Sequence, residues 1–186
     1  MHMKKVNALL FALLNASISP VFAVDGAISF HGSIITQACE VNNGEDVDVE
    51  LGTFSAAQFT AVGEKSPSIP FVLPLTNCPV AAAQEDPVPH FRLWLETETV
   101  PGHDDLAMLG NDFEDTMADG VGVKIVDATT KKAMPYNVLP PEDMEYQSTA
   151  ATLNINLLAY YVSYKEPKDI TAGPADARVN VTLDYR

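Results

Sequence analysis

Apolar and polar residues alternate along most of the chain, which is the pattern of strands with one buried face. Near the N-terminus, Ser29, His31 and Ser33 separate a row of apolar or small residues: Ile28, Phe30, Gly32 and Ile34. Similar rows occupy residues 47–51, 69–75, 91–95, 121–125, 153–161 and 179–185. These rows predict a protein built of strands, with helix confined to a short turn around residues 55–59.

Turn-forming residues separate the rows. They are Asn43-Gly44, the proline-bounded stretch 79–89, Pro101-Gly102, Pro140-Pro141 and Gly173-Pro174. Composition does not change across these breaks, and the sequence contains no internal repeat. Many short alternating strands in a chain of this length predict an all-β fold, namely a single β-sandwich domain.

The first 23 residues have the pattern of a secretory signal. Lys4 and Lys5 precede an apolar run at residues 6–14, and Val21 and Ala23 supply small residues for cleavage. The run is too short to cross a hydrocarbon core of about 30 Å as a helix. We therefore expect residues 1–23 to be a removed signal peptide, with an uncleaved anchor as the alternative, and 186 − 23 = 163 residues to remain.

Charge argues against nucleic acid as a partner. The signal region holds two of the eleven basic residues and none of the 25 acidic ones, so the remainder carries 9 − 25 = −16. Phosphate binding needs clustered Lys or Arg, and the sequence has no basic stripe. We expect neither nucleic acid nor anionic lipid to bind.

Two cysteines, Cys39 and Cys78, follow the signal region. An even cysteine count after an export signal predicts an oxidised pair. The loop that such a bond closes has about 40 residues, for which the chain-entropy model gives roughly 4 kcal/mol of stabilisation.

No catalytic or metal-binding motif is complete. His103-Asp104-Asp105 could form a metal or acid–base cluster, but its place after Pro101-Gly102 favours a solvated loop. Gly120-Val121-Gly122 lacks the third glycine of a dinucleotide-binding loop. We therefore predict that the protein is not an enzyme and uses no cofactor or metal.

The N-terminal row at residues 28–34 has two interpretations. A solvated strand with large apolar side chains invites pairing, so it must dock somewhere. It could be the first strand of its own sandwich, or it could add to the sheet of another chain.

Several segments together resemble a chaperone–usher pilin of the type 1 fimbrial family. Residues 26–35 before Cys39 are similar to the N-terminal extension of that family, with Gly32 at its glycine. Residues 70–73 leading to Cys78, and the segments 120–125 and 158–161, match further motifs. The C-terminal end is the most specific part, since Gly173 is fourteenth from the end and Tyr185 is next to last.

This resemblance implies an incomplete immunoglobulin-like sandwich, the pilin fold, which lacks its last strand. Residues 24–35 would be an N-terminal donor strand, with Ile28, Phe30, Gly32 and Ile34 inserted into a neighbour, and residues 36–186 would form the pilin domain. A groove would lie beside the C-terminal strand, at residues implied by the family pattern: Gly173, Val179, Val181, Leu183 and Tyr185.

The implied function is that of a structural subunit of a chaperone–usher fimbria that supports adhesion. Its expected partners are neighbouring pilin subunits in a homo- or hetero-polymer, a periplasmic chaperone and the outer-membrane usher. The subunit would pass through the periplasm to a cell-surface fimbrium, as a shaft subunit or a minor adaptor.

Two other classes of protein remain as alternatives. A self-contained secreted binding module, such as a single-domain lectin, would use residues 28–34 as an internal strand and stay monomeric. A periplasmic hydrolase would need a convergent polar site that the sequence does not offer.

Overall fold

The computed structural model describes residues 28–29, 37–80, 89–110 and 117–185. The chain divides into two units, Met1–His31 and Gly32–Arg186. Ile28 and Ser29 are the described residues of the first unit, and neither belongs to a helix or strand. The predicted signal peptide and the predicted donor residues Phe30, Gly32 and Ile34 lie outside the described residues. All the elements below belong to the second unit.

The described residues form nine strands and four single-turn 3-10 helices. The strands are β1 Glu40–Val41, β2 Ile69–Thr76, β3 His90–Glu96, β4 Thr99–Val100, β5 His103–Ala107, β6 Val121–Asp127, β7 Tyr146–Gln147, β8 Leu153–Ser163 and β9 Asn180–Tyr185. The 3-10 helices are η1 Asn42–Gly44, η2 Ala56–Gln58, η3 Glu142–Met144 and η4 Pro167–Asp169. No helix in the described part of the chain is long and apolar enough to cross a membrane.

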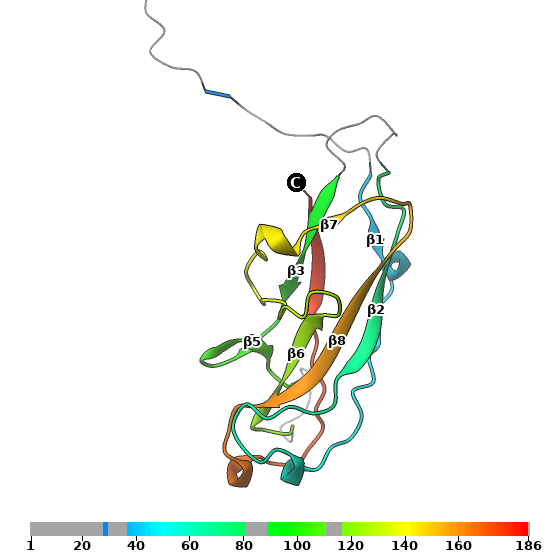
Figure 1. Cartoon of the computed structure of the whole chain (residues 1–186). Helices are drawn as coiled ribbons and strands as arrows, with labels where there is room; N and C mark the ends of the chain where they lie inside the picture. Colours follow the sequence, from blue (N-terminus) through cyan, green and yellow to red (C-terminus); the bar gives the residue numbers. More distant parts are fainter. Residues whose placement is uncertain (1–27, 30–36, 81–88, 111–116, 186) are drawn as a thin grey trace, which may run out of the picture. The chain divides into compact units, whose positions relative to one another are not determined.

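The strands form two antiparallel sheets. The larger sheet has the order β1-β2-β8-β6-β5-β4, and the smaller has the order β7-β3-β9. The long strand β8 lies between β2 and β6, where Leu157 pairs with Phe71 and Tyr161 pairs with Val123 (Figure 1). In the smaller sheet, β9 pairs along β3 with Leu183 opposite Leu93.

The inner faces of the two sheets share one hydrophobic core. Leu73 and Leu75 of β2, Leu93 and Leu95 of β3, and Leu157 of β8 are all at most 3% exposed and belong to the same cluster. Their alternation with more exposed neighbours is what the sequence pattern predicts for strands with one buried face. The prediction of an all-β, immunoglobulin-like sandwich is confirmed.

Prolines limit how far β2 can pair on its outer edge. β2 contains Pro70 and Pro74, and β1 pairs with it only at Leu75 and Thr76. Proline has no N–H to donate, so it is tolerated where a strand edge is not paired. The edge of β2 over residues 69–74 therefore lies outside the ladders formed by the described residues.

Several sequence predictions match strands directly. The rows at 69–75, 91–95, 121–125, 153–161 and 179–185 are β2, β3, β6, β8 and β9, and the predicted turn near residue 55 is η2. The row at 47–51 is an exception, because it belongs to no ladder formed by described residues. Its alternation is that of a strand, but no described strand pairs with it.

The interpretation of His103-Asp104-Asp105 as a loop is wrong. These residues begin β5, which follows the turn at Pro101-Gly102 and pairs with β4. Gly102 has φ +81°, which suits a glycine in a tight turn. Polar side chains are tolerated in β5 because it lies near the edge of the sheet.

Candidate functional site: an apolar groove beside the C-terminal strand

A groove of about 1200 Å³ opens on the core of the domain. Its floor is made by inner-face side chains of the larger sheet and one residue of β3: Phe71, Leu73, Leu95, Val123, Ile125, Leu157, Ala159 and Tyr161. These residues all belong to the hydrophobic core or pack against it. The floor of the groove is therefore apolar, and Phe71 is its half-buried member while the others are buried.

Residues 45–54, here called the first wall, form one side of the groove. Three side chains on this wall pack against the core: Val47, Leu51 and Phe54. Asp46, Asp48 and Glu50 are exposed between and beside them. This is the two-residue period of a strand, although the ladders among described residues do not include the segment.

Residues 170–181, here called the second wall, form the opposite side. Ala175, Ala177, Val179 and Val181 are half-buried and pack against the core, while Asp176, Arg178 and Asn180 are exposed. Before β9 begins at Asn180, this wall is tied to the domain by an isolated bridge between Thr171 and Asp119 and by separate hydrogen bonds. The Gly110 N–H donates to the Asp176 carbonyl at 3.0 Å, and the Thr97 hydroxyl donates to the Arg178 carbonyl at 2.7 Å.

The two walls show the alternation of strands, and no ladder among the described residues fills the space between them. β9 pairs with β3 on one edge, and no ladder among the described residues occupies its other edge. Buried backbone N–H and C=O groups need partners, so extended segments without a ladder can accept an added strand. Such a strand would also cover the apolar floor.

Tyr161 of β8 connects the floor to both walls. Its ring meets Phe54 of the first wall edge-on, with centroids 6.1 Å apart, and its hydroxyl donates to the Ala175 carbonyl of the second wall at 2.9 Å. Burial raises the pKa of Tyr161, and the nearby carboxylates Asp176 and Glu50 raise it further. The phenol therefore stays neutral and holds the walls in place at neutral pH.

The predicted C-terminal residues divide into two groups. Gly173, Val179 and Val181 line the groove. Leu183 and Tyr185 continue β9 beyond the lining and pack against the core, where the Tyr185 ring lies 5.7 Å from that of Phe91. The structure thus places all five on one continuous segment, with the last two beyond the groove.

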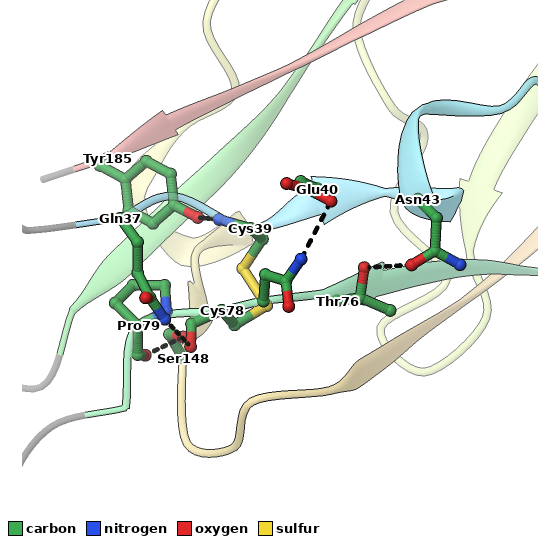
Figure 2. Close-up of a disulfide and its surroundings, with 10 residues drawn as sticks. Gln37, Cys39, Glu40, Asn43, Thr76, Cys78, Pro79, Ser148 and Tyr185 are labelled. Atoms are coloured by element: carbon green, nitrogen blue, oxygen red, sulfur yellow. Dashed lines mark hydrogen bonds between the residues drawn. A yellow bond between two sulfur atoms is a disulfide. The ribbon is translucent and has the colours of Figure 1, made fainter.

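Tyr185 also anchors the start of the domain, as Figure 2 shows. The Cys39 N–H donates to the Tyr185 hydroxyl at 2.7 Å. Cys39 forms a disulfide with Cys78, as the sequence predicted. The β1–β2 register, with Glu40 opposite Thr76, brings the two cysteines together. The chain leaving residues 24–35 is therefore fixed to the domain within four residues.

The first wall is the part of the site that the sequence did not identify. Its alternation at Val47, Val49 and Leu51 was visible, but it predicted an ordinary paired strand. The signal that could have separated it from the other rows is its run of exposed acids at every second position, Asp46, Asp48 and Glu50.

His103 and Asp105, from the possible metal or acid–base cluster, contact neighbouring strands and loops. The Asp105 carboxylate pairs with the Lys124 ammonium, and the His103 ring lies 5.9 Å from that of Tyr164. Within the described ranges, no group of three or more His, Cys, Asp or Glu residues is arranged to hold a metal ion.

Comparisons with known proteins agree with this architecture. The family model described as "Fimbrial protein" matches residues 28–186. An uncharacterized fimbrial-like protein of Escherichia coli K12, YraH, is 45% identical over 88% of this chain and 89% of its own length. A type-1 fimbrial protein subunit of Serratia marcescens is 30% identical over 99% of this chain and its full length.

Two solved structures share the fold at low sequence identity. The P pilus rod subunit PapA has a TM-score of 0.63 at 18% identity, covering 81% of this chain and all of that one. A chain from a structure of a chaperone–usher pilus has a TM-score of 0.61 at 17% identity, covering 90% of this chain and all of that one. At such identities the likeness shows the fold alone.

Proposed function

This chain belongs to the fimbrial protein family and is a structural subunit of a pilus, and we propose that it polymerises by exchanging strands with its neighbours. The observation that carries the proposal is the groove, because its floor is apolar and no strand formed by the described residues lies between its two walls. In this mechanism, the groove of one subunit receives the N-terminal segment of another.

The donor in this proposal is the segment 24–35. Its row of Ile28, Phe30, Gly32 and Ile34 would point toward the groove floor. The seven residues from 28 to 34 span roughly 23 Å as a strand, and the ten residues of the first wall span roughly 33 Å, so the lengths are compatible. Gly32 would let the two backbones approach closely.

Burial of the donor side chains favours the complex. Ile28, Phe30 and Ile34 would each contribute roughly 1.5–3 kcal/mol, or about 5–9 kcal/mol together before the cost of ordering the segment. Backbone hydrogen bonds to both walls would add to this, because they satisfy groups that the groove leaves without a ladder. The contact is head-to-tail and does not close on itself, so it generates a filament.

The same groove accounts for the remaining partners in the proposal. Removal of residues 1–23 on export would free the donor segment in the periplasm. A periplasmic chaperone would cover the groove with a strand of its own, and at the outer-membrane usher the donor of the next subunit would replace it. The subunit would then stand in a cell-surface fimbrium that supports adhesion, in the shaft or as a minor adaptor.

Deletion of residues 24–35 tests the donor role directly. The truncated subunit should still fold with its chaperone, because its groove is unchanged. It should not join the growing fibre, because it has no segment to insert into the groove of the preceding subunit. The measurement is the content of truncated protein in purified fibres. Incorporation equal to that of the intact chain would refute the donor role.

Two point variants sharpen this deletion. Phe30→Asp places a charge on the inward row and should block incorporation about as strongly as the deletion. Ser29→Asn changes the outward row and keeps it uncharged, so it is the matched control and should be incorporated normally.

A further inference from the structure

The mouth of the groove is strongly acidic. Of the described residues that line it, five are acidic and one is basic: Glu45, Asp46, Asp48, Glu50, Asp176 and Arg178. The acids on the first wall at positions 46, 48 and 50 are exposed, and so is Asp176 on the second wall. Because these residues alternate with the inward side chains, they form the rim of the groove.

The single cation of the rim is already engaged. The Arg178 guanidinium lies 3.6 Å from the Asp46 carboxylate, which joins the two walls across the mouth of the groove. No ion pair among the described residues involves Asp48, Glu50 or Asp176. The charges of these three carboxylates therefore face whatever strand enters the groove.

Glu50 and Asp176 act on the same place from opposite walls. Burial is the main reason that the pKa of Tyr161 is raised, and the carboxylates of Asp176 and Glu50 raise it further. The Tyr161 hydroxyl donates to the Ala175 carbonyl of the second wall. A strand inserted here would have a carboxylate on each side of it. In a sheet, like charges directly opposite each other destabilise the pairing.

The donor segment of this chain suits such a rim. The donor segment 24–35 has one acidic residue, Asp25, which precedes the apolar row, and residues 26–39 contain no Asp or Glu. If the apolar row points inward, the side chains facing the rim are those of Ser29, His31 and Ser33, which are neutral or cationic. The outward positions 29, 31 and 33 thus bring no carboxylate to the acidic rim.

We propose that Asp48, Glu50 and Asp176 select the strand that enters the groove: they reject donors with carboxylates at the outward positions that correspond to 29, 31 and 33, and they accept residues 24–35 of a second copy of this chain. The inference rests on the proposed donor-strand function and adds a rule of partner choice to it. The carboxylates act mainly by repelling strands that carry acidic side chains. An interface can become specific by disfavouring competitors in this way as well as by favouring the right partner.

The test compares three peptides of residues 24–35 for binding to the full mature chain. One has the native sequence, one carries Ser29→Asp and Ser33→Asp, and the matched control carries Ser29→Asn and Ser33→Asn. Each is measured against the native chain and against a chain with Asp48→Asn, Glu50→Gln and Asp176→Asn. The chain's own segment competes equally with every peptide, so affinities are compared as ratios.

The aspartate peptide should bind the native chain about 5- to 20-fold more weakly than the asparagine peptide. This ratio should approach one on the neutralised chain, and it should shrink when salt is raised from about 20 mM to about 0.5 M, since the rim is exposed.

The outcomes separate the two proposals. If the asparagine and aspartate peptides bind equally well, or if their ratio is unchanged on the neutralised chain, charge selection by the rim is refuted and the donor-strand function stands. If none of the peptides binds either chain, the donor-strand function is refuted and the rim rule falls with it.

Discussion

At the scale of single residues, the domain depends on polar groups that are buried and fully bonded. Asp127 at the end of β6 is 5% exposed. One carboxylate oxygen accepts from the Thr129 N–H at 2.9 Å and from the Thr130 N–H at 2.6 Å, and the other accepts from the Tyr146 hydroxyl at 2.7 Å. These bonds hold the turn after β6 against β7.

The pKa of Asp127 reflects this environment. Burial alone would raise it, but the hydrogen bonds from Thr130, Tyr146 and Thr129 outweigh burial and hold the pKa below its usual value. A carboxyl with a lowered folded-state pKa stabilises the fold above its unfolded pKa of about 3.9. That stabilisation is lost as the pH falls through the lower, folded-state pKa.

We predict that Asp127→Asn lowers the free energy of unfolding by about 1–3 kcal/mol at pH 7, because it removes charge-assisted bonds to buried donors. The difference from the native chain should shrink below about pH 4. Denaturant unfolding at several pH values measures both effects.

Asp143→Asn is the matched control for this substitution. Asp143 forms an exposed ion pair with Lys132, so its loss should change stability by less than about 1 kcal/mol at any pH. Equal costs for the two substitutions, or a cost of Asp127→Asn that does not depend on pH, would contradict the account.

At the scale of elements, the rows of alternating side chains predicted the long strands well. β2, β3 and β8 bury residues at alternate positions, and the apolar residues of β9 are half-buried. β6 is different, because nearly all of its residues are buried on both faces. The short strands β1, β4 and β7 have two residues each, too few for any period to be seen.

Other parts of the core come from irregular chain, which no period marks. Met134 and Tyr136 are 0% and 2% exposed although neither lies in a strand. The Tyr136 hydroxyl donates to the Val123 carbonyl of β6 at 3.2 Å. Only the tertiary contact shows that this segment covers the sheet, so the sequence alone could not predict it.

The groove was predictable in part. The C-terminal end of the chain indicated which strand borders it, through Gly173 and Tyr185. The sequence could not identify the first wall, because a segment borders the groove only through its contacts with segments distant in sequence. Sequence periodicity reports a strand-like segment but does not report whether it has a partner.

The disulfide is the main restraint on the element that leads into the first wall. β1 pairs with β2 through two residue pairs only, and Cys39–Cys78 adds a covalent link beside them. We predict that Cys39→Ser with Cys78→Ser lowers the free energy of unfolding by roughly 3–4 kcal/mol. Denaturant unfolding measures this loss.

Hydrogen exchange then shows where the loss is felt. In the variant without the disulfide, the free energy of opening measured by amide exchange should be much lower for residues 40–54 than for β8, because β8 is paired on both edges. Reduction of the native chain provides the control and should produce the same pattern. Uniform loss of protection across β1 and β8 would contradict a local role for the disulfide.

At the scale of the whole molecule, the proposed mechanism places donor and acceptor on one chain. The acceptor groove is bounded by residues 45–54 and 170–181, and the expected donor ends four residues before Cys39. The disulfide fixes the start of the domain to the chain just after β2, and the bond from Cys39 to Tyr185 fixes it to β9, the strand that borders the groove. A chain with this layout can both give and receive a strand, which is what a linear polymer requires.

The most direct test of strand exchange is a photo-cross-link from the donor. A benzoylphenylalanine placed at Phe30 would be activated in assembled fibres grown from a mixture of isotopically light and heavy subunits, and the linked peptides would be identified by mass spectrometry. Strand exchange predicts links from one copy to residues 45–54, 170–181 or the groove floor of another copy. Links confined to the same copy, or to surfaces outside the groove, would contradict it.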